Sequence, residues 1–213
     1  MTQATPDDGL IELTSHELLV LLSLNDGPAA SATRRELRLQ ELPEGSPVMA
    51  AGVSTLLVRG LATVDGELLQ PTGNVLPLTR ILTTAEQWVE AATISGGRSN
   101  AALLVGALMG AVVIEPRPFG VWHVRPLRLG TDLVQSAATL VRTAFEAADG
   151  ARPFGGTIKT VDATAATTSN VRIGEDGVWE LAAGPVGSAL APAAVGPDPT
   201  FAVLVDGVRA TRA

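Results

Sequence analysis

The chain has 213 residues, of which 46% are hydrophobic and 17% charged, and its formal net charge at pH 7 is −7. This composition is too apolar for a disordered protein, and the net negative charge argues against polyanionic partners. The sequence contains no cysteine, which excludes disulfides and thiolate metal sites.

The sequence shows no pattern typical of export or of a membrane anchor. Residues 1–9 are polar and acidic and lack the basic and apolar regions of a signal peptide. The longest apolar run, residues 101–114, contains Gly106 and Gly110 and is shorter than the about 20 residues that a membrane-spanning helix needs. A soluble, cytoplasmic protein is therefore expected. Lys159 is the only lysine among many Ala, Gly and Arg residues, a bias typical of a GC-rich bacterial genome.

The N-terminal part predicts helices followed by a hairpin. Thr14 and Glu17 have the spacing of a capping box, and Ser46 followed by Pro47 is typical of a helix start. Gly60 is the expected end of that later helix. The predicted elements are helices from residue 14 to 24, 32 to 39 and 46 to 60, a hairpin over 61–70 around Asp65-Gly66, and a short helix within 74–84.

From residue 83 the pattern changes mostly to strands, with one helix that Thr131 or Asp132 caps. The predicted strands cover residues 87–94, 120–129, 157–161, 171–173, 178–181 and 201–205, one or two strands fall within 103–114, and the helix runs to Ala148. Helices followed by strands without regular alternation predict an α+β fold with a central antiparallel sheet packed with helices. One domain over residues 1–213 is expected, with 10–82 and 83–213 as a subdivision.

Two short motifs occur twice. Arg-Pro-Phe-Gly stands at residues 117–120 and 152–155, and Gly-Val-Trp stands at 120–122 and 177–179. Turn-then-strand chemistry arising twice explains both, and a duplicated β-unit with a pseudo-two-fold axis is the alternative hypothesis. The two motifs recur at different spacings, which counts against a clean repeat.

No catalytic, cofactor-binding or metal-binding motif is present. The only histidines, His16 and His123, are far apart and have no metal-ligand spacing. The sequence also lacks a Gly-x-Ser-x-Gly elbow, a phosphate-binding loop and a dinucleotide fingerprint. A non-enzymatic protein without cofactor or metal is therefore expected. A small-molecule enzyme or sensor would need a deep pocket, and His123, Arg125 and Arg128 are the one cluster worth testing for it.

The N-terminal helices and hairpin have the layout of a winged helix, so a DNA-binding regulator is the alternative function. The charges oppose it, because residues 1–82 contain five basic and ten acidic residues. The helix expected to read the DNA has one arginine, Arg59, at its end. Since phosphate contacts dominate DNA affinity, a winged-helix shape without nucleic-acid binding is favoured.

Residues 12–22 and 51–61, the latter ending in Leu57-Val58-Arg59-Gly60-Leu61, resemble the N-terminal part of the EspG family. These proteins are actinobacterial cytosolic chaperones of type VII secretion. The strands that contain residues 106–114 and 120–122, and the capped helix that follows them, occur in a similar order, so the resemblance covers about residues 12–150. It implies an α+β fold with pseudo-two-fold halves and recognition of hydrophobic helical secretion substrates. The family's C-terminal helix is not predicted here, because residues 190–199 are rich in Ala and Pro.

A second resemblance links residues 13–73 to bacterial relatives of Golgi phosphoprotein 3, a family that continues as helices where this chain turns to strands. Neither resemblance supplies binding residues. The residues predicted to bind a protein partner are therefore the large rings near the sheet, Phe119, Trp122 and Trp179. The identity of the partner and a homo-oligomeric state stay open.

Overall fold

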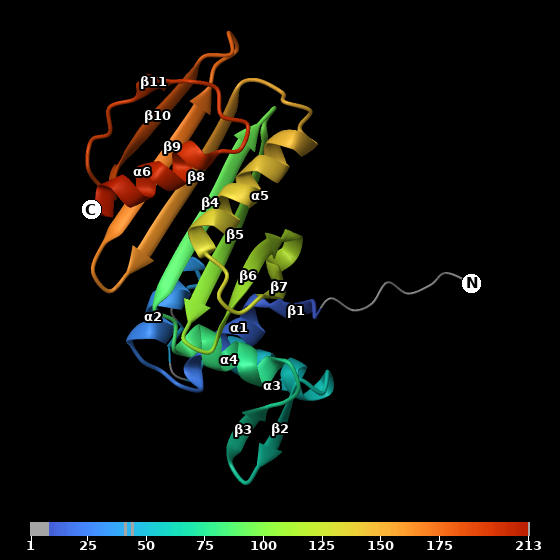
Figure 1. Ribbon diagram of the computed structural model, residues 1–213. Helices are drawn as coiled ribbons and strands as arrows, with labels where there is room; N and C mark the ends of the chain where they lie inside the picture. The colour runs from blue at the N-terminus through green and yellow to red at the C-terminus, as the bar shows by residue number, and fades with distance from the viewer. Residues whose placement is uncertain (1–8, 41, 44, 213) are drawn as a thin grey trace. The chain divides into compact units, whose positions relative to one another are not determined.

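The computed structural model describes residues 9–40, 42–43 and 45–212 (Figure 1). It confirms the α+β class, with helices packed on a nine-stranded antiparallel sheet whose strand order is β1-β7-β6-β5-β4-β8-β9-β10-β11. The chain divides into two compact units, one with the described residues up to Glu86 and Val105–Leu129, the other with Gln87–Leu104 and the residues from Gly130 on. Whether the units act as the single expected domain stays a prediction.

The first unit contains the predicted N-terminal helices and hairpin. Thr14 and Glu17 form the expected capping box, and the Ser46 hydroxyl caps the third helix. The hairpin strands flank Gly66-Glu67, one residue later than predicted. The elements are β1 Ile11–Thr14, α1 Ser15–Ser23, α2 Pro28–Glu36, α3 Pro47–Val58, β2 Ala62–Asp65, β3 Leu68–Pro71, α4 Val75–Thr83, β6 Gly110–Arg117, the 3-10 turn η1 Pro118–Gly120 and β7 Val121–Leu127.

In the second unit, α5 and α6 cover one face of a sheet (Figure 1). Asp132 caps α5 as predicted, by accepting a hydrogen bond from the Gln135 amide at 3.0 Å. The elements are β4 Gln87–Ser95, β5 Arg98–Ala107, which ends in the first unit, α5 Leu133–Ala147, β8 Phe154–Asp162, β9 Ala166–Ile173, β10 Trp179–Pro185, β11 Ala193–Val195 and α6 Ala202–Arg212.

Four aromatic rings form the core beneath these helices. Phe201 lies with its ring centroid 5.5 Å from that of Phe145, 5.8 Å from Phe154 and 5.2 Å from Trp179. Phe154, Phe201 and Trp179 are buried. In a chain with few aromatics, this cluster concentrates much of the ring area in the interior of one unit.

Two predicted elements need correction. The sequence predicts a strand over residues 201–205, but residues 202–205 form the start of a C-terminal helix, α6. The second helix starts at Pro28 and ends at Glu36, four and three residues earlier than expected. The apolar stretch within 103–114, where one or two strands are expected, forms two strands, β5 and β6, and β5 begins earlier than expected, at Arg98. Among the described residues, no helix is long and apolar enough to cross a membrane.

Candidate functional site

The tip between β6 and β7 presents a fully exposed aromatic ring. Phe119 lies in the turn η1 with its side chain completely accessible and a backbone φ of 65°. The next residue, Gly120, has a φ of 70°. The left-handed conformation costs a bulky residue about 1–2 kcal/mol, so it persists where the surroundings hold it.

Ser15 and Trp122 link this tip to the first turn of α1. The Trp122 indole Nε1 donates a hydrogen bond to the Ser15 Oγ at 2.9 Å, and the same hydroxyl donates to the Gly120 carbonyl at 3.2 Å. A hydroxyl can accept and donate at once, so Ser15 joins Gly120 and Trp122, which both follow Phe119 in the chain. The segment that follows Phe119 is therefore anchored to α1.

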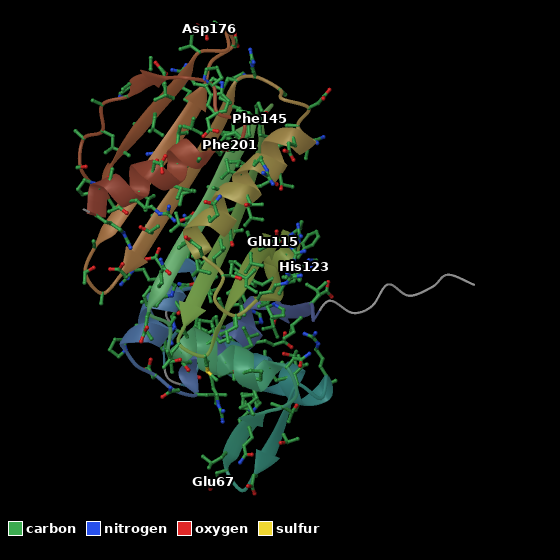
Figure 2. The ribbon with its side chains drawn as sticks, viewed as in Figure 1. Glu67, Glu115, His123, Phe145, Asp176 and Phe201 are labelled. Carbon is green, nitrogen blue, oxygen red and sulfur yellow. The ribbon has the colours of Figure 1, made fainter. Side chains whose placement is uncertain are left out.

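A charged network lies on β1, β6 and β7 next to the tip. Glu115 pairs with Arg117 at 3.1 Å and with Arg125 at 2.9 Å, and His123 Nε2 lies 2.9 Å from Glu12 Oε1. The His123 Nδ1 accepts from Arg117 Nε at 3.2 Å, so the ring proton of a neutral His123 lies on Nε2. Figure 2 shows Glu115 and His123 side by side, as the strand register requires. Such exposed pairs each contribute about 0–1 kcal/mol to the free energy of unfolding. Their main effect is to orient the side chains on this surface.

A pocket of about 280 Å³ lies in the first unit between α4 and strands β1, β6 and β7. Its lining is aliphatic apart from one amide, and it contains no titratable side chain. The lining residues are Gly9, Ile11, Asn74, Pro77, Leu78, Ile81, Val112, Val124 and Pro126. The pocket therefore offers no acid, base or nucleophile for catalysis, and His123, Arg125 and Arg128 are not among the residues that line it.

The arginine at the end of α3 makes its hydrogen bonds within the protein. Arg59 Nη1 donates to both carboxylate oxygens of the fully buried Glu17, at 3.0 and 2.8 Å, and Arg59 Nη2 donates to the Glu12 carbonyl at 2.8 Å. Three of its donor contacts are thus intramolecular. This leaves little of the guanidinium for a DNA phosphate.

The structure separates the three residues predicted to bind a partner. Phe119 and Trp122 lie together at the start of β7, whereas Trp179 is buried in the aromatic core of the second unit with 5% of its surface exposed. His123 and Arg125 join the charged network, and Arg128 lies beyond the end of β7. Sequence reasoning missed Ser15, because nothing in its spacing points to a partner 107 residues away.

Among the residues that the structure describes, no group of three or more His, Asp or Glu side chains could hold a metal ion. The candidate site is an exposed aromatic ring on an anchored turn, beside the ion pairs of Glu12, Glu115, Arg117, His123 and Arg125. Surfaces of this kind, with an aromatic anchor and a polar surround, are typical of protein recognition.

The fold resembles that of a solved secretion chaperone. The chain is similar to the Mycobacterium tuberculosis type VII secretion system chaperone EspG5, which was solved in complex with a PE25–PPE41 dimer. The similarity has a TM-score of 0.59 at 12% sequence identity and covers 95% of this chain and 96% of that chain. It confirms the EspG-like fold that the sequence predicted. No protein-family model matches the sequence, and no curated protein matches it.

Proposed function

We propose that the protein is a non-enzymatic, chaperone-like factor that binds helical substrates of type VII secretion. The observation that carries this proposal is the fold similarity over nearly the whole chain to a chaperone solved with a PE25–PPE41 dimer bound. A factor that meets its substrates before export would act in the cytoplasm.

The tip that contains Phe119 is the proposed contact with the partner. The fully exposed Phe119 forgoes stabilisation in the free protein, because burying such a side chain contributes about 1.5–3 kcal/mol of free energy. Large rings in the centre of an interface are common hot spots. Trp122 would support the tip through its hydrogen bond to Ser15. Trp179 would act only through the packing of the second unit, because its side chain is buried.

The test is co-purification with a PE25–PPE41 dimer and, in parallel, capture from the cytosol of the source organism, scored for helical secreted proteins. Wild type is expected to retain a helical secretion substrate. Phe119→Ser is expected to weaken this binding by about 2–4 kcal/mol, the range for a hot-spot residue. Calorimetry or biolayer interferometry on the recovered pair measures the loss.

Leu129→Ser is the matched control, since Leu129 is 80% exposed and lies beyond the opposite end of β7. It is expected to bind as wild type does. Equal binding by Phe119→Ser and wild type would move the contact elsewhere. Recovery of no helical secreted protein in either experiment would contradict the chaperone function itself.

A further inference from the structure

We infer that Ser15 and Trp122 are positioning residues that hold Phe119 in its outward conformation before a partner arrives. The inference deepens the proposed function, on which the role of Phe119 in binding rests. The restraint itself is a property of the free protein and is testable without a partner.

The hydrogen bonds are placed where they resist relaxation of the turn. Phe119 and Gly120 both have positive φ values, which a phenylalanine rarely adopts. Without a restraint, the turn is expected to relax toward negative φ values, and the ring would then leave its fully exposed position. The Ser15 hydroxyl donates to the Gly120 carbonyl and thereby holds the peptide between Gly120 and Val121, one residue after Phe119.

The Ser15 hydroxyl also limits the space around Gly120. A Cβ added there would lie 3.2 Å from the Ser15 Oγ, so the backbone passes close to the hydroxyl. Trp122 completes the arrangement from β7, because its indole N–H occupies the acceptor side of Ser15 and orients the hydroxyl hydrogen toward Gly120. Trp122 is half-buried, and its backbone pairs with Leu13 of β1 and Pro116 of β6.

A pre-organised tip has a functional consequence. Ordering a rotamer-rich side chain or a loop at an interface costs free energy on binding, and a restraint present in the free protein removes that cost. The partner would therefore meet a ring already in place. Loss of the restraint should weaken binding even though Ser15 and Trp122 need not touch the partner.

Limited proteolysis with chymotrypsin tests the restraint directly, because this protease accepts a large apolar side chain in its specificity pocket. Cleavage after Phe119 gives fragments 1–119 and 120–213, which mass spectrometry identifies. Ser15→Ala and Trp122→Phe are expected to speed this cleavage about two- to tenfold, the factor for loss of one hydrogen bond. Phe119→Ser should abolish these fragments, and Leu129→Ser should leave their rate unchanged.

The double variant separates a shared restraint from two independent packing defects. If Ser15 and Trp122 act through one hydrogen-bonded unit, Ser15→Ala with Trp122→Phe is cleaved no faster than Ser15→Ala alone. Multiplication of the two single effects, or unchanged cleavage in the single variants, would overturn the inference.

Binding of the PE25–PPE41 dimer to the same variants separates the inference from the proposed function. Weaker binding by Ser15→Ala and Trp122→Phe, together with faster cleavage, supports both. Faster cleavage with undiminished binding means that the restraint exists and does not position Phe119 for a partner, which overturns the positioning role. Failure of wild type to bind the dimer counts against the proposed function, and the cleavage rates still decide whether the tip is restrained.

Discussion

Glu17 is a fully buried carboxylate in α1 whose charge is met by Arg59. Arg59→Met removes that partner, and breaking a buried ion pair by removing one member costs about 3–5 kcal/mol. The Arg59 side chain is 41% exposed, so water can partly compensate. We expect a loss of about 2–4 kcal/mol in the free energy of unfolding, measured by urea denaturation followed by circular dichroism.

Arg172→Met is the control for this prediction, since the Arg172 side chain is 73% exposed and lies 3.4 Å from the Glu180 carboxylate. Such a surface pair is worth about 0–1 kcal/mol. Glu17→Gln combined with Arg59→Met should be less destabilised than Arg59→Met alone, because no buried charge is left. Equal losses in the Arg172 and Arg59 variants would contradict a structural role for the buried pair.

Asp162, at the end of β8, gives the protein an acid-sensitive contact. The Thr164 hydroxyl lowers the pKa of this carboxyl from 3.8 to about 2, helped by the Thr164 and Ala165 amides and by Arg212, against partial burial. A lowered pKa in the folded state means stability that is complete above the unfolded pKa. That stability is lost as the pH falls toward the folded pKa.

The stability difference between wild type and Asp162→Asn should therefore shrink as the pH falls from near 4 to near 2. The asparagine keeps an acceptor for Thr164 and loses the charge that faces Arg212 at 2.8 Å. Urea midpoints measured across this range test the prediction. Parallel curves at a constant offset would show that the charge of Asp162 contributes nothing specific. Asp198, whose pKa is also lowered, leaves some acid sensitivity in the variant.

At the scale of whole elements, Gly52 sets how closely α3 approaches α1. A Cβ added at Gly52 would lie 2.5 Å from the His16 carbonyl oxygen and 2.7 Å from Val20 Cγ2. Alanine favours a helix by about 1 kcal/mol over glycine, but the overlap forces the helices apart. We expect Gly52→Ala to destabilise the protein by about 1–3 kcal/mol, measured by thermal or urea unfolding.

Gly196→Ala is the comparison for Gly52→Ala, because an added Cβ at Gly196 would meet no heavy atom within 4 Å. A change of at most about 0.5 kcal/mol is expected there. If Gly52→Ala is neutral or stabilising, the two helices can separate without cost, and the close approach does not contribute to the fold.

The sequence predicted elements well where local chemistry decides them. Thr14, Ser46 and Asp132 all cap helices as expected, because capping depends on residues a few positions apart. The C-terminal helix α6 was missed, although Phe201, Leu204, Val205 and Val208 have helical spacing and are all buried. Its β-branched valines and Gly207 lowered the local helix preference, which contacts with β9 and β10 outweigh.

The candidate site was predictable only in part. Phe119 and Phe154 occupy the same place in the repeated Arg-Pro-Phe-Gly motif, yet Phe119 is fully exposed and Phe154 is 2% exposed. Likewise, the Trp122 indole makes a hydrogen bond to Ser15, whereas Trp179 joins the aromatic core. Tertiary contacts at long sequence separation decide such differences, and a motif of four residues does not predict those contacts.

At the scale of the whole molecule, the net charge distinguishes between the two candidate functions, protein binding and DNA binding. The helices and hairpin have the order of a winged helix, but the net charge is −7. Arg59 at the end of α3 is committed to Glu17 and the Glu12 carbonyl. Because DNA affinity depends on phosphate contacts by basic residues, we expect no measurable binding to a labelled DNA duplex.

Fluorescence anisotropy in a low-salt buffer gives this prediction its hardest test, since counterion release makes non-specific DNA binding strongest there. A rise in anisotropy that falls steeply as salt is added would contradict the prediction and favour a DNA-binding regulator. Phe119→Ser distinguishes the two functions further, because the tip lies outside the winged-helix layout of α1–α3 and β2–β3. The variant should lose substrate binding if the protein is a chaperone, whereas a DNA-binding regulator would shift the duplex equally well with or without the ring.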